Sequence, residues 1–338
     1  MAGDAISLVT GGGGFVGRHL VRQLVARGER VRSLGRHRYD HLPGEVEQVV
    51  GDITAANVVA SACEGVGCVY HTAALPRVWG RRETFERINV GGTRNVVDAC
   101  RSRGVPRLVH TSTPSVVFGA RGHSDADERT PYPPGYLAHY PATKRDAEEL
   151  VLRANDEVLA TVALRPHLVF GPEDQSLMPR VVERARAGRL RIVGDGTNPI
   201  SVAYVENVAA AHLQAADELS GEGRCAGKAY FINELRPVAA GEWISTLLDM
   251  AGEPPCRRRI SAGIAYAGGA AMEAVWTVLR KRTEPPMTRF VARQLSEPHS
   301  FRIDAAIRDF GYAPPVDWPT ALERTRAWAA TAFGERGA

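Results

Sequence analysis

Residues 9–17, "VTGGGGFVG", are the stretch that decides the fold. They follow the apolar run "AISLVT" and lead into "FVGRHLVRQLVARG", where apolar residues recur at helical spacing before a glycine stop signal. A strand that passes through glycines into a helix can turn tightly and point backbone N–H groups at a pyrophosphate. The alternative is a flexible turn without a ligand. The strand-to-helix context favours a dinucleotide-binding turn, formed by Gly11, Gly14, Phe15, Val16 and Gly17.

The rest of the chain alternates in the same way. "VEQVVGD", "GVGCVYHTAA" and "VPRLVHTST" are typical of short buried strands, and helical stretches such as "ERINVGGTRNVVDACRSRG" separate them. This alternation predicts an α/β protein with a Rossmann-like, doubly wound parallel sheet and helices on both faces. After "LATVALRPHLVFGP", prolines interrupt shorter elements. We therefore expect a dinucleotide-binding domain over residues 1–172, with a returning segment at 197–234, and a smaller C-terminal substrate-binding subdomain formed mainly by 173–196 and 235–338.

Composition restricts the class of protein. A chain of 338 residues that is 44% hydrophobic and 24% charged can bury one large core or two unequal ones. The net charge of +4 comes from 42 basic and 38 acidic residues that are interspersed, which argues against a nucleic-acid partner. The five cysteines have neither CxxC nor zinc spacing, so we predict a reduced compartment and no metal site. No signal-like segment or long apolar run is present, and the expected location is cytoplasmic.

The end of the second predicted strand, "ERVRSLGRHRYD" at residues 29–40, carries positive charge where NAD-binding folds carry an acid. An acid at position 35 would accept the ribose hydroxyls of NAD and repel a 2′-phosphate. Gly35 leaves room for the phosphate, and Arg36 and Arg38 can pair with it. The alternative is a solvated basic loop. The stretch predicts NADP(H) as the cofactor, with Asp52, after the third strand, either at the adenine amino group or as a helix cap.

A tyrosine and a lysine four residues apart form the second candidate constellation. In "LAHYPATKRDAEELV", Tyr140 and Lys144 lie on the same face of a predicted helix. A tyrosine hydroxyl has a pKa near ~10, so acid–base work at neutral pH requires a nearby cation, which Lys144 can supply. A helical contact without consequence is the alternative. The preceding strand ends in the hydroxyls of "TSTPS", at the sheet edge where ligands gather in parallel sheets.

The order TGxxGFxG, GD, HTAA, a strand ending TST, YxxxK and RPxxVFGP resembles the extended short-chain dehydrogenase/reductase superfamily over nearly the whole chain. The resemblance implies Tyr140 as general acid/base, Lys144 as its electrostatic partner and ribose ligand, and Thr113 as the hydroxyl that polarises the reacting carbonyl. The superfamily usually has serine at that last position, so Ser112 and Ser115 stay open as substitutes. The resemblance also implies further cofactor-binding positions, Ile53, Ala73, Ala74 and Pro166, and a central-helix asparagine, Asn89.

Within the superfamily, "HTSTPSVVF", "PHLVFGP" and "EPPMTRFVARQLS" resemble the 3β-hydroxysteroid dehydrogenase branch, and most closely the 2-alkyl-3-ketoalkanoate reductases of bacterial long-chain olefin and β-lactone biosynthesis. This resemblance implies an enzyme that reduces a hydrophobic β-keto acid, and the NADP(H) predicted from residues 35–38 favours that direction because cells hold this cofactor mainly reduced. The same branch contains 4-carboxysterol 3-dehydrogenases, which run the oxidation. A nucleotide-sugar epimerase or dehydratase and a catalytically silent NADP(H)-binding regulator are further alternatives.

The substrate side is less defined by the sequence. Arg77 in "AALPRVWGRR" is either a ligand of the substrate carboxylate or a surface residue, and His167 is either a packed loop residue or a substrate ligand. Thr113 and Ser115 complete the predicted substrate contacts. The apolar stretch 260–282 ends in three basic residues. We expect it either to cover the substrate cleft or to lie on a membrane surface or a pathway enzyme. The alkyl chain lengths, the stereochemistry and a homodimeric state stay open.

Overall fold

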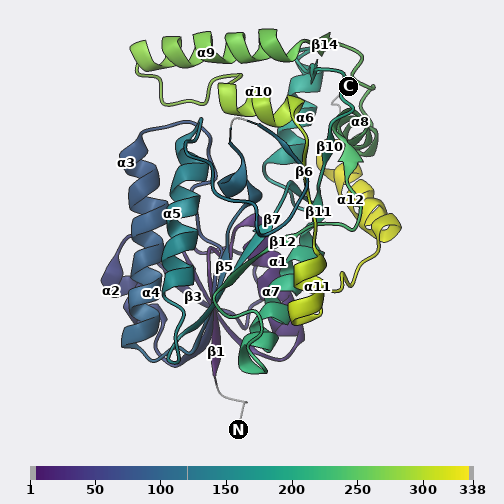
Figure 1. Cartoon of the computed structure of the whole chain (residues 1–338). Coiled ribbons are helices and arrows are strands. Elements are labelled where there is room, and N and C mark those ends of the chain that lie inside the picture. The colour runs from purple at the N-terminus through teal and green to yellow at the C-terminus, as the bar shows by residue number, and fades with distance from the viewer. Residues whose placement is uncertain (1–4, 120, 335–338) are drawn as a thin grey trace.

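The chain folds around one seven-stranded parallel sheet, as a computed structural model of residues 5–119 and 121–334 shows (Figure 1). The strand order is β12-β7-β5-β4-β1-β2-β3. From β1, the chain adds β2 and β3 on one side and then β4, β5, β7 and β12 on the other. Every neighbouring pair in this sheet is parallel. This confirms the predicted doubly wound α/β sheet. Its strands are β1 (Ile6–Thr10), β2 (Arg30–Gly35), β3 (Glu47–Val50), β4 (Val66–His71), β5 (Arg107–Thr111), β7 (Ala160–Pro166) and β12 (Lys228–Ile232).

Helices cover both faces of the sheet because its strands are apolar on both sides. Leu8 and Val9 are neighbours in β1 and both are fully buried, but they belong to two different hydrophobic clusters. Such runs are typical of strands that lie between two helical layers. The Val9 face packs against α1 (Phe15–Ala26), α7 (Val205–Ser220) and α11 (Asp304–Phe310), and the Leu8 face packs against α2 (Ala56–Ala62), α4 (Gly92–Ser102) and α5 (His139–Arg153).

The chain returns to the main sheet late. Strand β12 pairs in parallel with β7, from Lys228 opposite Val162 to Ile232 opposite Pro166.

The short α3 (Arg82–Phe85) and the π-helix Glu86–Gly91 lead into α4 without a break. Single π-helical turns inside longer helices are frequent at functional sites.

A smaller set of elements lies beside the carboxyl ends of the strands (Figure 1). Its sheet has the order β13-β10-β15-β6. In its core, the ring of Phe170 makes tilted or edge-on contacts with the rings of Tyr204, Trp243 and Trp318. These elements are β6 (His123–Ala126), β10 (Pro199–Ile200), β13 (Val238–Ala239), β15 (His299–Phe301), the pairs β8 (Val169–Phe170) with β11 (Ala203–Tyr204) and β9 (Ile192–Val193) with β14 (Arg259–Ile260), and the helices α6 (Leu177–Arg186), α8 (Ala240–Met250) and α12 (Trp318–Phe333).

Two further helices lie at the top of the molecule in Figure 1, where α9 (Ala262–Val278) packs on α10 (Arg289–Ser296). The contact is close because α9 presents small residues there. A Cβ atom on Gly269 would lie 2.7 Å from the carbonyl carbon of Thr288. Among the described residues, no helix is long and apolar enough to cross a membrane.

Candidate active site

The glycine turn between β1 and α1 is tight and leaves no room for side chains. Gly11 has φ of +74°, a left-handed conformation that glycine adopts without strain. A Cβ atom on Gly17 would lie 2.2 Å from the carbonyl oxygen of Gly11, so the helix can approach the turn this closely only with glycine there. Phe15 and Val16 open α1 directly after the turn. The sequence therefore needs glycine at both ends of the turn, for two different steric reasons.

The side chain of Arg18 is hydrogen-bonded to the backbone of the glycine turn, a contact that the sequence did not reveal. Its Nη2 donates to the carbonyl oxygen of Gly13 at 3.0 Å, and its Nη1 pairs with Glu173 at 2.7 Å. Arg22 binds the same carboxylate at 2.6 Å. Burial alone would raise the pKa of Glu173, but the bonds from Arg22 and Arg18 outweigh it and lower the pKa to about 2. Since Glu173 lies 155 positions after Arg18, no local pattern could have revealed the pair.

The predicted adenosine end lies at the carboxyl ends of β2 and β3. Arg36 and Arg38 follow β2 and are both exposed. Asp52 follows β3, and a backbone hydrogen bond from Thr54 lowers its pKa, with Arg87 and Arg36 acting in the same direction. The helix-cap alternative for Asp52 is wrong, because the N-cap of α2 is Ala55 and no side chain caps that helix. The structure brings Arg36 and Asp52 to one edge of the sheet, with Ile53 buried beside them.

Tyr39 is a second residue that sequence reasoning missed. Its ring lies against Gly13 and Gly35, because a Cβ atom on either glycine would stand 2.4 Å and 2.7 Å from ring carbons. The backbone of Ala73 approaches the same turn, with its Cα 2.9 Å from where a Cβ atom of Gly11 would stand. Ala74 follows it and is partly buried. The turn is thus bordered by an aromatic ring on one side and by the end of β4 on the other.

Lys144 is buried in α5 and pinned to the end of β5. Its Nζ donates to the carbonyl oxygen of Thr111 at 2.7 Å and lies 3.2 Å from Nε2 of His110. Burial lowers the pKa of Lys144 to about 8, while the nearby Glu148 carboxylate acts in the opposite direction. The lysine therefore sits at a fixed point between helix and sheet, with an ammonium that is easier to deprotonate than a surface lysine.

Tyr140 lies one helical turn before Lys144, and its hydroxyl lies near the side chain of Thr113. Burial raises the pKa of Tyr140, and the nearby Thr113 hydroxyl acts in the opposite direction. The Thr113 oxygen also accepts the backbone N–H of Ser115 at 3.2 Å. Of the three hydroxyls that the sequence left open, Thr113 is thus placed beside the tyrosine.

Two buried histidines lie beneath this site. His71 at the end of β4 and His110 in β5 have their ring centres 5.2 Å apart. The His71 ring nitrogens contact the hydroxyls of Thr10 and Thr93 at 2.7 and 2.9 Å. Burial, and then the charge of Lys144, lower the pKa of His71 to about 3 and that of His110 well below its usual range. Both rings are therefore neutral, and Nε2 of His110 can accept from the lysine.

Asn89 ties the loop after β4 to α5. It lies in the π-helix, where its Oδ1 accepts the N–H of Leu75 at 2.7 Å and its Nδ2 donates to the Thr143 hydroxyl at 3.1 Å. Thr143 immediately precedes Lys144 in α5. The structure thus links the central-helix asparagine to the helix that carries the tyrosine and the lysine.

Of the predicted substrate residues, Ser115 and His167 are buried and Arg77 is exposed. Ser115 accepts a bond from Nε2 of Gln294 in α10 at 3.4 Å, so α10 borders the Thr113 side of the site. His167 is buried directly after Pro166, which ends β7, and its Nε2 lies 2.6 Å from Nδ1 of His299. Arg77, by contrast, is exposed on the loop after β4. His167 is thus a packed loop residue, one of the two roles that the sequence left open for it.

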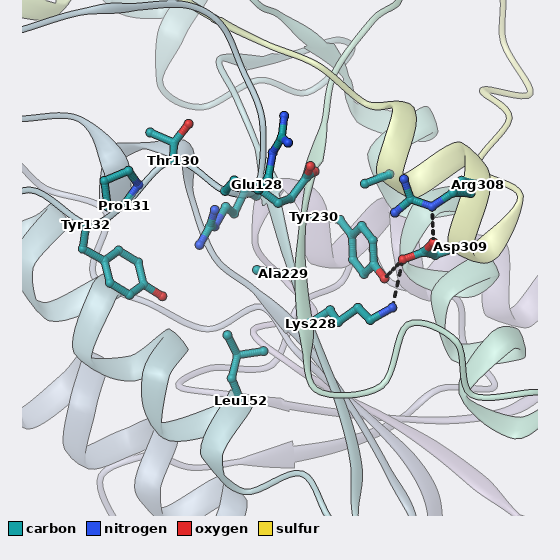
Figure 2. Close-up of a pocket in the computed structure, with 13 residues that line it drawn as sticks. Glu128, Thr130, Pro131, Tyr132, Leu152, Lys228, Ala229, Tyr230, Arg308 and Asp309 are labelled. Carbon is teal, nitrogen blue, oxygen red and sulfur yellow. Dashed lines mark hydrogen bonds and ion pairs between the residues drawn. The ribbon is translucent and has the colours of Figure 1, made fainter.

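A depression of about 510 Å³ lies elsewhere, beside β12 and α11 (Figure 2). Lys228, Tyr230 and Arg308 converge on the carboxylate of Asp309, at 3.2, 2.6 and 2.7 Å. None of the residues predicted to bind cofactor or substrate lines it. Four of its polar residues, Lys228, Tyr230, Arg308 and Asp309, are engaged with one another.

Comparisons with known proteins agree with this geometry. Residues 8–258 match the 3-beta hydroxysteroid dehydrogenase/isomerase family. The chain is 47% identical to a 2-alkyl-3-oxoalkanoate reductase of Stenotrophomonas maltophilia, over 96% of this chain and 99% of that protein. It is 36% identical to a 3beta-hydroxysteroid-dehydrogenase/decarboxylase of Arabidopsis thaliana, over 94% of this chain and 78% of that protein. The solved structure of MoeE5 in complex with UDP-glucose and NAD superposes with a TM-score of 0.74 at 25% identity, covering 97% and 99% of the two chains. The chain belongs to the 3-beta hydroxysteroid dehydrogenase/isomerase family and is an oxidoreductase.

Proposed function

We propose that this protein uses NADPH to reduce the 3-keto group of a hydrophobic 2-alkyl-3-keto acid to the 2-alkyl-3-hydroxy acid. The observation that carries the proposal is the 47% identity, over almost the full length of both chains, to a 2-alkyl-3-oxoalkanoate reductase. The site supports a reduction of this kind because it joins a tyrosine hydroxyl, a second hydroxyl and a buried lysine at the carboxyl ends of the strands.

The residues present fit a nicotinamide dinucleotide. The glycine turn, which a Cβ atom would fill, would hold the pyrophosphate, and the exposed Arg36 and Arg38 would pair with a 2′-phosphate beside Gly35. Asp52 would accept a hydrogen bond from the adenine amino group. When bound, the cofactor supplies the hydride for the ketone carbon.

The side chains of the protein would supply the proton for the ketone oxygen and stabilise the negative charge that develops on it. Tyr140 would donate its hydroxyl proton to the ketone oxygen as negative charge develops there, and Thr113 would donate a hydrogen bond to the same oxygen. Lys144 would place a positive charge next to the resulting phenolate. The carbonyl oxygen of Thr111 and the neutral ring of His110 fix that charge in position, so little reorganisation is needed during the reaction.

The direct test is a product assay. The protein would be incubated with NADPH and a synthetic 2-alkyl-3-keto acid, and the hydroxy acid followed by mass spectrometry against a control without enzyme. The reverse reaction, from the hydroxy acid with NADP⁺, checks the same chemistry. Absence of product in both directions, with NADPH or NADH, would overturn the proposal.

A second candidate is oxidation of a 4-carboxysterol, because the Arabidopsis relative is named as a 3beta-hydroxysteroid-dehydrogenase/decarboxylase. The basic residues after β2 favour NADPH, a cofactor that cells hold mainly reduced, and so favour the reductase. Faster turnover of a 3β-hydroxysterol-4-carboxylate than of the 2-alkyl-3-hydroxy acid would select the sterol activity instead.

The cofactor preference can be tested at Arg36 and Arg38. We expect the double variant Arg36→Ala, Arg38→Ala to raise the KM for NADPH by about 10–100-fold, since a charge-assisted hydrogen bond contributes roughly 1.5–3 kcal/mol, and to leave the KM for NADH nearly unchanged. Arg30→Ala, at the opposite end of β2, is the matched control. Gly35→Asp is a poorer probe because its Cβ atom would lie 2.7 Å from the Tyr39 ring. Equal wild-type use of both cofactors would contradict the assignment.

The pH dependence of the rate should report on Lys144. Because burial lowers its pKa from 10.5 to about 8, we expect kcat/KM to fall as the pH rises above about 8. Loss of stability through this lysine does not explain such a fall. Between pH 8 and pH 10.5 the lysine is protonated in the unfolded chain but largely deprotonated in the folded protein, so its contribution to the free energy of unfolding rises with pH. Lys144→Arg keeps the charge and should flatten the alkaline limb, at a lower rate. A wild-type profile that is flat through pH ~10 would contradict this role.

A further inference from the structure

Gly13 is kept free of a side chain by a residue outside the glycine turn. Its φ is not positive, so its backbone conformation alone does not require glycine. A Cβ atom on Gly13 would lie 2.4, 2.4 and 2.5 Å from three carbons of the Tyr39 ring, which are the nearest atoms to it. Real Cβ atoms do not approach other atoms this closely. A side chain at position 13 and the ring of Tyr39 therefore exclude each other.

The same ring fills the space beside Gly35, at the end of β2. A Cβ atom on Gly35 would lie 2.7 Å from Cε2 of Tyr39 and 3.5 Å from its hydroxyl oxygen. In NAD-binding folds, an acid at this end of the strand extends its carboxylate toward the adenosine ribose. The Tyr39 hydroxyl therefore lies close to where the carboxylate of such an acid would lie.

Tyr39 is held in this position by its backbone and by its ring. Its N–H donates to Oε1 of Gln48 in β3 at 2.8 Å, and its carbonyl oxygen accepts from Nε2 of the same residue at 3.2 Å. The ring packs against the hydrophobic cluster that includes Leu42 and Val46, and its centre lies 5.4 Å from that of His41. A tyrosine that is fixed in this way loses little conformational entropy when a ligand binds to it.

The Tyr39 hydroxyl is available to a ligand. The side chain is only partly buried, and its hydroxyl makes no hydrogen bond to any residue within 5–119 and 121–334. Arg36 and Arg38, on the same loop, are exposed. A phenol hydroxyl can donate a hydrogen bond to a phosphate oxygen, and because it carries no charge it does not repel the phosphate as an acid at position 35 would.

We propose that Tyr39 determines the cofactor specificity: its hydroxyl takes the place of the acid that is absent at position 35 and donates a hydrogen bond to the 2′-phosphate of NADP(H). Arg36 and Arg38 supply positive charge, but as exposed side chains they must be ordered on binding. The ring also keeps an acid out of position 35, so the arrangements for NAD and for NADP(H) exclude each other here. The inference rests on the NADP(H) preference proposed above and is independent of which ketone the enzyme reduces.

Two fragments of the cofactor test the proposal without turnover. Adenosine 2′,5′-bisphosphate carries the 2′-phosphate, 5′-AMP does not, and neither contains nicotinamide. By isothermal titration calorimetry, we expect wild type to bind the bisphosphate more tightly than 5′-AMP. Tyr39→Phe should weaken binding of the bisphosphate by about 10–100-fold, the range for a hydrogen bond to a charged group. It should weaken binding of 5′-AMP by no more than a few-fold, because a bond to a neutral ribose hydroxyl contributes less.

Tyr136→Phe is the matched control, because it removes a tyrosine hydroxyl at another part of the sheet. That hydroxyl binds the carbonyl oxygen of Val116, after β5, and both β4 and β1 lie between β5 and β2. This variant should bind both fragments as wild type does. Tyr39→Phe keeps the ring, and circular dichroism melting checks that both variants fold.

Gly35→Asp and Tyr39→Ser, made singly and together, test the steric exclusion. Gly35→Asp alone should weaken the binding of NADPH and of NADH, because the new Cβ atom would lie 2.7 Å from the ring. Adding Tyr39→Ser frees that space, and the aspartate can then accept hydrogen bonds from the ribose hydroxyls. The double variant should therefore bind NADH more tightly than Gly35→Asp does, a non-additive effect that fluorescence titration measures.

The outcomes separate the role of Tyr39 from the cofactor preference. If wild type prefers the bisphosphate but Tyr39→Phe binds it equally well, or loses affinity for both fragments by the same factor, Tyr39 does not determine the specificity. The same conclusion follows if Gly35→Asp alone binds NADH as tightly as the double variant, since the ring would then not exclude the acid. Equal binding of the two fragments by wild type would refute the NADP(H) preference itself, and the role of Tyr39 with it.

Discussion

Tyr140→Phe is expected to lower kcat/KM for ketone reduction by at least ~100-fold, the scale that loss of a general acid produces. The substitution removes the α5 hydroxyl that lies near Thr113 and leaves the ring in place. Cofactor affinity should change little, because Lys144 keeps its bonds to Thr111 and His110. Steady-state kinetics with any accepted ketone, together with fluorescence titration of NADPH, measure the two effects separately.

Tyr136→Phe is the matched control for this prediction. Tyr136 lies four residues earlier, and its hydroxyl donates to the backbone carbonyl oxygen of Val116 at 2.6 Å. Its loss should leave the rate within a few-fold of wild type. If Tyr140→Phe also stays within a few-fold, Tyr140 is not the proton donor and the mechanism proposed above fails.

Glu148→Ala is expected to destabilise the protein by about 3–5 kcal/mol, because it leaves the guanidinium of Arg165 buried without its counter-charge. The two side chains are 0% and 5% exposed and joined by bonds of 2.6 and 2.9 Å. Burial by itself would raise the pKa of Glu148, and the charge of Arg165 reverses that effect and lowers it. Tyr132 donates a further bond of 2.6 Å to the same carboxylate. Urea unfolding, followed by circular dichroism, gives the free energy.

Two variants separate a buried ion pair from a general effect on α5. Glu149→Ala removes the neighbouring carboxylate, whose pairs with Arg145 and Arg153 lie on the surface, and should cost no more than ~1 kcal/mol. Replacing both buried partners, as Glu148→Leu with Arg165→Met, should recover most of the lost stability because no unpaired charge is left behind. Equal destabilisation by Glu148→Ala and Glu149→Ala would contradict this account.

The sequence by itself determined those features that depend on short-range pattern. The run of strand, glycines and helix around Gly11 and Gly17 is local, since the left-handed φ of Gly11 and the close approach at Gly17 arise within seven residues. The parallel sheet followed from alternating strands and helices. The four-residue spacing of Tyr140 and Lys144 placed both on one face of α5, because the helical period fixes that relation without any tertiary contact.

Only the tertiary structure decided which side chains meet across the sheet. Three hydroxyls follow β5, and Thr113 is the one beside Tyr140 because the turn after the strand meets α5 at that residue. The contact of His110 with Lys144 spans 34 positions, and that of Arg18 with Glu173 spans 155, so they exist only once strands and helices are assembled. The open face of α9 is likewise a property of packing. Its sequence is apolar on most sides and does not reveal which side α10 covers. In the fold the buried side is that of Ala265, Gly269 and Glu273, and a Cβ atom on Gly269 would lie 2.7 Å from the backbone of Thr288.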